Sequence, residues 1–168
     1  MKSRSMRSML AAALALAAAA AGAQQAVILV RHAELQGAAM AEPRQLPLSE
    51  AGEARAGRLA EMLKDAGVAA IYVTDFARTQ QTAQPLARAL GLNPVVLPKG
   101  DPRELVDRLR SGHGAQTVLL VGHTDTLPGL LTALGHPAEI RIEPQDYGNL
   151  FVVVPKPEGA PAFLRLRY

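Results

Sequence analysis

The sequence contains no cysteine, which excludes a catalytic thiol, a thiolate metal site and disulfide support. Its apolar stretch from Met9 to Ala21 holds 13 residues, whereas crossing a bilayer takes about 20. Beyond that stretch there is no internal repeat and no long low-complexity segment. These absences favour a single globular domain that is held together by its core alone.

The N-terminus has the three parts of a secretory signal peptide. Lys2, Arg4 and Arg7 form a basic start, the apolar stretch follows, and Ala21-Gly22-Ala23 is a small-residue cleavage site. An uncleaved anchor and a soluble alanine-rich helix are the alternatives. We expect residues 1–23 to be removed on export, so that the mature protein is periplasmic or secreted.

The charge balance depends on this cleavage. The whole chain carries +3, but without its signal peptide it keeps 15 basic and 15 acidic residues. No basic field then remains to attract nucleic acid or an anionic membrane surface, so neither partner is expected. Residues 24–168 are enough for one domain with a proper core and no membrane span.

Strand-like and helix-like segments alternate along this domain. Continuous apolar, β-branched runs indicate buried strands, and capping residues mark the helices. The predicted strands are 26–30, 69–75, 93–98, 115–122, 149–155 and 160–168, and the predicted helices are 49–67, 76–91, 101–112 and 124–135. The expected fold class is α/β: a mainly parallel sheet with helices on both faces and a C-terminal strand pair.

Cationic side chains follow three of the predicted strands. Arg31 and His32 follow the first, Arg78 lies just past the second, and His123 follows the strand at 115–122. Ligands of open α/β sheets bind beyond the carboxyl ends of the strands, so these four groups should converge. Because arginine donors match phosphate oxygens, the pattern indicates a phosphate pocket.

The two helices that follow these residues would add to the pocket. Helices starting near Phe76 and Thr124 would aim their N-terminal amides at the same place.

Four segments, VRHAE, LSEAGEARA, TDFARTQQTA and VGHTDTLPGLL, resemble in order and spacing the signature motifs of the histidine phosphatase superfamily, with its phosphoglycerate-mutase-like fold. The resemblance covers essentially all of residues 24–168. It implies a small, exported phosphohydrolase that acts on a phosphomonoester or phosphoramidate. Its partner would be a small phosphorylated substrate, and neither a metal nor another cofactor would be needed.

The resemblance also implies roles for the four residues. His32 would be the nucleophile, forming a phosphohistidine that water then hydrolyses. Arg31, Arg78 and His123 would hold the phosphoryl oxygens and stabilise charge in the transition state. Because neutral His32 must present a lone pair, its other ring nitrogen should donate to a backbone carbonyl or a carboxylate.

Three carboxylates are candidates for protonating the leaving group. Asp101, which starts a predicted helix, is the first choice, although it suits an N-cap before Pro102 equally well. Asp125, two residues after His123, is the rival and could also be a cap. Glu34 is the third candidate and also suits an ion pair with a nearby cation.

Two other function classes compete with this prediction. The first is a phosphate or phosphoester-binding module that keeps the pocket but turns over little. The second is a metallohydrolase using His32, Glu34, His123 and Asp125, which ranks last because two arginines would repel a cation. Specificity is expected in the loops 34–48, 98–103 and 136–148, where Tyr147 is interpreted as a packing residue, and the oligomeric state is left open.

Overall fold

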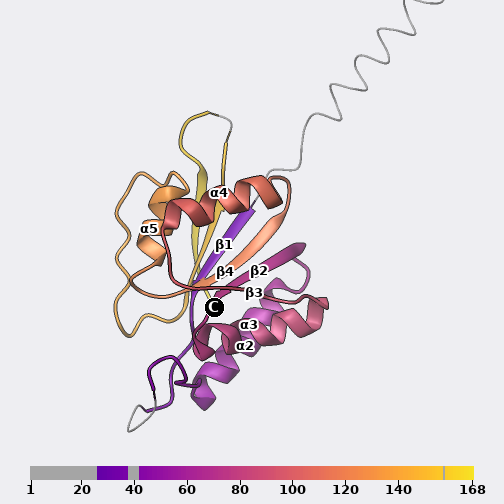
Figure 1. The fold of residues 1–168 in the computed structure, drawn as a ribbon, viewed down its shortest axis with the longest axis vertical. Helices are drawn as coiled ribbons and strands as arrows, with labels where there is room; N and C mark the ends of the chain where they lie inside the picture. Colours follow the sequence, from indigo (N-terminus) through magenta and orange to yellow (C-terminus); the bar gives the residue numbers. More distant parts are fainter. Residues whose placement is uncertain (1–25, 38–41, 157) are drawn as a thin grey trace, which may run out of the picture.

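The computed structural model describes residues 26–37, 42–156 and 158–168 (Figure 1). The predicted signal peptide lies outside the described residues. Within these ranges, no helix combines the length and the apolar character that a membrane span requires.

The described elements follow the predicted alternation. They are β1 (Ala26–Arg31), α2 (Glu50–Leu63), β2 (Val68–Thr74), α3 (Ala77–Leu90), β3 (Val95–Leu97), α4 (Pro102–His113), β4 (Thr117–Gly122), α5 (Leu127–Ala133), β5 (Asn149–Val154) and β6 (Ala162–Arg167).

One sheet, with strand order β3-β2-β4-β1-β5-β6, forms the centre of the molecule. The first four strands in this order run parallel, β5 runs antiparallel to β1, and β6 runs antiparallel to β5. The chain is therefore α/β with a mainly parallel sheet and a C-terminal antiparallel pair, which confirms the predicted fold class.

Helices cover both faces of this sheet, with α4 and α5 on one face and α2 and α3 on the other (Figure 1). On one face, α4 and α5 pack against alternate residues of the central strands, among them Val27 and Leu120. On the other face, the core joins residues of α2 and α3 to the intervening strand residues, such as Ile28 and Val121. Since β1 and β4 are buried on both faces, their sequences read as continuous apolar runs.

Local capping explains where the helices begin and end. The hydroxyl of Ser49 accepts a hydrogen bond from the amide of Gly52 at the start of α2, and Gly91 ends α3 with a φ of 65°. At α4, the Asp101 carboxylate accepts from the amide of Arg103, with Pro102 at the first helical position.

The prediction that a helix starts near Thr124 is wrong. Residues 124–126 form a turn and α5 begins at Leu127. The backbone amides of Thr126 and Leu127 both donate to the carbonyl of His123, at 3.2 and 3.0 Å. These amides are therefore satisfied by the chain itself and are not aimed at the predicted pocket.

Candidate active site

The strand register brings the predicted residues to one edge of the sheet. Arg31 of β1 pairs with Gly122 of β4, and the backbone amide of His32 donates to the carbonyl of Gly122 at 2.9 Å. His123 directly follows Gly122, so the two histidines leave the sheet side by side. Their ring centroids lie 5.4 Å apart in an edge-to-face arrangement.

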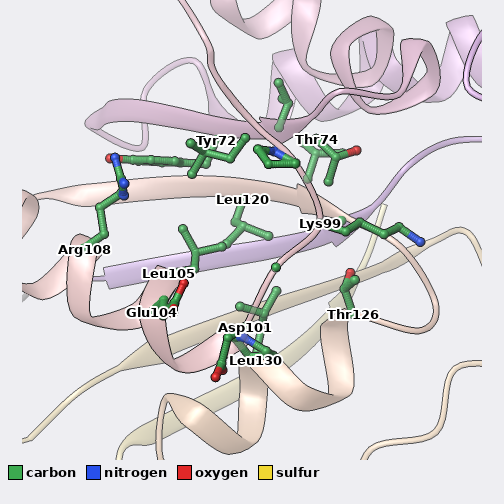
Figure 2. Close-up of a pocket in the computed structure, with 17 residues that line it drawn as sticks. Tyr72, Thr74, Lys99, Asp101, Glu104, Leu105, Arg108, Leu120, Thr126 and Leu130 are labelled. Carbon is green, nitrogen blue, oxygen red and sulfur yellow. The ribbon is translucent and has the colours of Figure 1, made fainter.

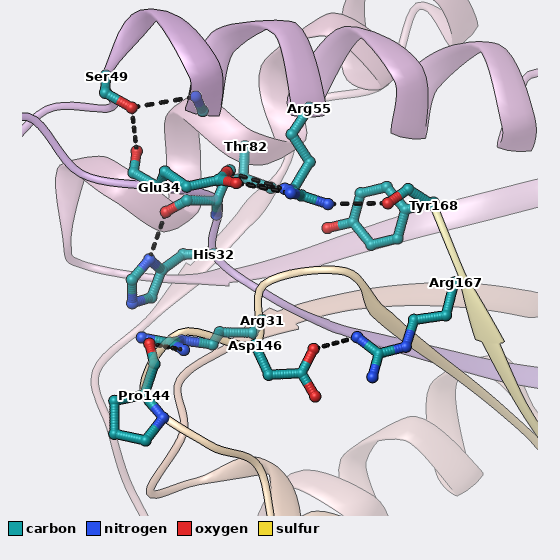
Figure 3. Close-up of polar contacts among 12 residues, drawn as sticks. Arg31, His32, Glu34, Ser49, Arg55, Thr82, Pro144, Asp146, Arg167 and Tyr168 are labelled. Atoms are coloured by element: carbon teal, nitrogen blue, oxygen red, sulfur yellow. Dashed lines mark hydrogen bonds and ion pairs between the residues drawn. The ribbon is translucent and has the colours of Figure 1, made fainter.

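The His32 ring is buried, with 5% of the residue exposed. Its Nδ1 lies 2.8 Å from the carbonyl oxygen of Ala33 (Figure 3). A carbonyl can only accept, so Nδ1 carries the hydrogen and Nε2 carries the lone pair of the neutral ring. The predicted backbone partner of the His32 ring is thus present.

Burial also sets the charge of His32. Desolvation, reinforced by the charges of Arg31, Arg78 and Lys99, lowers the pKa of His32 to about 4, although the hydrogen bond that its ring donates to the Ala33 carbonyl opposes this shift. The ring is therefore neutral at physiological pH, which is the form that a nucleophile needs.

His123 is held by two threonines. Its backbone amide donates to the hydroxyl of Thr126 at 2.9 Å, and its ring Nε2 lies 2.8 Å from the hydroxyl of Thr74 at the end of β2. Burial, together with the positive charge of Lys99, lowers the pKa of His123 to about 3. Its Nδ1 is buried and has no hydrogen-bond partner in the described part of the chain.

Arg31 is clamped by the loop before β5. It is 7% exposed, and one of its terminal nitrogens donates to the backbone carbonyls of Pro144 at 2.7 Å and Glu143 at 3.3 Å (Figure 3). The Tyr147 ring covers the guanidinium, with 4.0 Å from its centroid to Cζ. These contacts fix the direction of the guanidinium and leave its buried Nε without a partner among the described residues.

Arg78 lies in the first turn of α3, half-buried. One terminal nitrogen donates to the carbonyl of Pro43 at 2.8 Å, and Cζ lies 4.2 Å from the centroid of the Phe76 ring. The Nε of Arg78 is also buried without a partner in the described chain. The predicted pair of arginines and pair of histidines thus share one edge of the sheet, and each arginine keeps an unused Nε donor.

The three candidate acids have different surroundings. Asp101 caps α4 and is exposed, and its carboxylate accepts from the amide of Arg103 at 2.8 Å. Glu34 is held by Arg55 through bonds of 2.6 to 2.9 Å (Figure 3). Partial burial opposes ionisation of Glu34, but the hydrogen bonds from Arg55 prevail and its pKa is lowered. The expected ion pair of Glu34 is therefore present.

Asp125 is the candidate acid whose charge acts on the cluster. Its carboxylate lies 2.8 Å from the Lys99 ammonium. Burial lowers the pKa of both His123 and Arg78, and the negative charge of Asp125 opposes this lowering. Partial burial opposes ionisation, but the bond from Lys99 prevails and the pKa of Asp125 is lowered. Asp125 is thus an ionised neighbour of the cluster.

Two side chains at this edge, Lys99 and Tyr147, were not predicted to be part of the site. Lys99, two residues after β3, lies with its ammonium 5.3 Å from the centroid of the Phe76 ring and lowers the pKa of both histidines. Tyr147, interpreted as a packing residue, covers Arg31 and lies 6.0 Å from the His32 ring, centroid to centroid.

Both could have been found from the topology. Lys99 follows the end of a parallel strand, as the other cations do. Tyr147 precedes an antiparallel strand, whose N-terminal end lies at the same edge of the sheet.

A metal centre built from the four proposed ligands has little support in the geometry. Glu34 and Asp125 are each engaged by a cation. Across residues 26–37, 42–156 and 158–168, no three His, Cys, Asp or Glu side chains gather in a way that could hold a metal ion. The positive charges that surround the histidines come from arginine and lysine.

Comparisons with known proteins agree with this arrangement. Residues 27–99 match the histidine phosphatase superfamily, branch 1. A protein assigned as the phosphohistidine phosphatase SixA from Agrobacterium tumefaciens is 25% identical, with a TM-score of 0.64, over 83% of this chain and 97% of that one. No curated protein sequence matches significantly.

Two further solved structures share the fold. The protein histidine phosphatase SixA in complex with tungstate has a TM-score of 0.67 at 20% identity, covering 84% of this chain and 96% of its own. A mycobacterial glucosyl-3-phosphoglycerate phosphatase has a TM-score of 0.61 at 16% identity, covering 85% and 97%. The segment that matches the histidine phosphatase superfamily holds Arg31, His32 and Arg78, which confirms the resemblance seen in the sequence for this part of the chain.

Proposed function

We propose that this protein is a phosphatase that transfers a phosphoryl group first to His32 and then to water. The observation that carries the proposal is the set of buried polar atoms that have no partner among the described residues: Nε of Arg31, Nε of Arg78 and Nδ1 of His123. A buried polar atom without a partner costs about 1–3 kcal/mol, so a site that keeps three of them suits a ligand that satisfies them. The oxygens of a phosphoryl group are such acceptors, and arginine binds them with matched geometry.

The chemistry starts at the Nε2 lone pair of His32. As the bond from Nε2 to phosphorus forms, the bond from phosphorus to the leaving group breaks and the leaving group takes the electron pair. Arg31, Arg78 and His123 stabilise the charge on the phosphoryl oxygens. Water then attacks phosphorus, the bond to Nε2 breaks, and inorganic phosphate departs.

The surroundings of the acids indicate which leaving groups suit the site. The Asp101 carboxylate is committed to the cap of α4, and the bond from Lys99 favours the ionised form of Asp125. We assign proton transfer to Asp125, because its charge reaches His123 and Arg78. An ionised carboxylate can take a proton from the attacking water but has none to give to the leaving group, so leaving groups that need little protonation are favoured. Aryl phosphates have this property, because a phenolate can leave with little protonation. The similar SixA proteins are described as phosphohistidine or protein histidine phosphatases.

The proposal includes metal independence and export. The side-chain cations would supply the positive charge that a metal ion supplies elsewhere. The signal-peptide pattern of residues 1–23 supports a periplasmic or secreted enzyme.

A phosphoester-binding module is the second candidate. The observation that favours it is that each of the three candidate acids is already engaged, by a helix cap, by Arg55 or by Lys99. Such a module would take a phosphoryl group onto His32 once, or only bind it, without steady turnover.

Turnover of an aryl phosphate by the purified protein with a chelator present tests the proposal. We expect steady release of phenolate, inhibition by vanadate, and a phosphoenzyme that is labile to acid and stable to alkali, as a phosphoramidate is. His32→Ala should lose both turnover and the phosphoenzyme, and its circular dichroism should match the wild type. A burst without turnover would identify the binding module, and substantial activity of His32→Ala would refute the proposal.

A further inference from the structure

A cavity of about 220 Å³ lies beside the proposed phosphate site (Figure 2). It lies between the ends of β2 and β4, the loop 97–101, and α4 with Leu130 of α5, and it is partly open to solvent. None of Arg31, His32, Arg78 and His123 lines it. It is therefore a separate space, and nothing in the chemistry described above uses it.

The cavity shares a wall with His123. Thr74 and Thr126, whose hydroxyls bond the ring and the amide of His123, both line it. Lys99 lines the same end, which is the end nearest the cluster of cations (Figure 2). The leaving group of a substrate whose phosphoryl oxygens are bound by His123 would therefore lie next to this space.

The middle of the cavity is apolar. Its lining includes Leu97, Leu105, Leu120 and Leu130, together with Tyr72. The Tyr72 hydroxyl is already bonded to Nε2 of His113 at 2.9 Å, so it is not a free donor for a ligand. Charged residues, Lys99, Asp101, Glu104 and Arg108, also line the cavity, so it is the space among the leucines that favours a hydrocarbon group.

The volume is large enough for a ring. Protein interiors are close-packed, and voids much larger than a water molecule are few. An engineered cavity of about 150 Å³, lined by similar apolar side chains, stays dry and binds benzene. The cavity here is larger, at about 220 Å³, and so has room for a phenyl ring with a short substituent.

We propose that this cavity receives the apolar, ring-sized leaving group of the substrate, so that the preferred substrates are phosphomonoesters of phenols or of similarly apolar alcohols. The proposal rests on the proposed phosphatase function and names its substrate class. The phosphoryl group is held by the cations at the edge of the sheet, and the leaving group lies between α4 and the sheet.

A series of 4-alkylphenyl phosphates tests this assignment, because the leaving groups have nearly the same pKa and differ only in size. We expect kcat/KM to rise about fourfold with each added methylene until the cavity is full. Leu105→Trp, which fills the cavity from α4, should abolish this increase. Leu164→Trp, the same change at an exposed position of β6, should preserve it. Leu105→Ala should move the optimum to a larger substituent.

Binding of 4-ethylphenol, followed by NMR, separates this proposal from the proposed function because it needs no turnover. We expect the wild type and Leu164→Trp to bind the phenol, and Leu105→Trp to bind it at least tenfold more weakly. Equal kcat/KM along the series, or hydrolysis of phosphates without any binding of the phenol, would overturn the cavity assignment alone. Binding of the phenol without hydrolysis of any phosphate would overturn the proposed function, and with it the leaving-group role.

Discussion

The neutral His32 ring should make the stability of this protein depend on pH in a predictable direction. Burial lowers the pKa of His32 from 6.5 to about 4 in the folded chain. Above pH 6.5 the ring is neutral in both the folded and the unfolded chain. As the pH falls from 6.5 towards 4, the His32 ring becomes protonated in the unfolded chain but stays neutral in the folded chain. The free energy of unfolding therefore decreases. Below pH 4 this contribution is fully lost.

The magnitude follows from the two pKa values. Each pH unit between them is worth about 1.4 kcal/mol, so the interval from 6.5 to about 4 corresponds to roughly 3 kcal/mol. That is a large part of the 5–15 kcal/mol that stabilises a typical domain. His123, whose pKa burial lowers to about 3, adds a loss in the same direction.

Urea unfolding of the wild type and of His32→Asn at several pH values between 7.5 and 4 measures this effect. The asparagine amide keeps a donor for the Ala33 carbonyl but does not titrate. The wild type should lose about 3 kcal/mol more than the variant over this range. Parallel loss in both proteins, or an NMR titration of the His32 ring with a midpoint near 6.5, would refute the argument.

Three further predictions concern the fold, the arginines and export. Gly52→Ala should destabilise the protein by about 1–3 kcal/mol in thermal unfolding, because a Cβ there would lie 2.2 Å from the carbonyl oxygen of Glu34. Gly57→Ala on the same helix, with nothing within 4 Å, should instead stabilise it by about 0.5–1 kcal/mol; equal effects would contradict this account. Arg78→Ala should lower kcat/KM by about 3 kcal/mol of transition-state stabilisation, a hundredfold or more, and a loss below tenfold would contradict its placement at the phosphoryl oxygens. Intact mass of the cell-envelope protein should lack residues 1–23, and a full-length mass confined to the cytosol would exclude export.

The fold could be predicted from the sequence because the signals are local. The central strands are buried on both faces, so their apolar runs are unbroken, and Ser49, Gly91 and Asp101 act at the helix ends that they mark. The start of α5 could not be predicted in the same way. Thr124 resembles a cap, but the Thr126 hydroxyl bonds the His123 amide and delays the helix to Leu127.

The four central residues of the candidate site were also accessible from the sequence, because each follows a parallel strand at its carboxyl end. The partners that orient them were not. The guanidinium of Arg31 is oriented by hydrogen bonds to the carbonyls of Glu143 and Pro144, and that of Arg78 by a hydrogen bond to the carbonyl of Pro43. Backbone carbonyls are present at every residue, so no pattern of side chains reveals which of them a distant arginine will reach.

The same cations serve two requirements that at first conflict. A phosphoryl group needs positive charge around it, whereas His32 must stay unprotonated to attack. Arg31, Arg78 and Lys99 attract the anion and also oppose a proton on His32, together with burial. When the anion binds, its negative charge offsets these cations, and the pKa of His123 must rise, because an opposite charge beside an imidazole favours its protonated form. The site would thus hold a neutral nucleophile before binding and gain a stronger donor, at His123, once the substrate is in place.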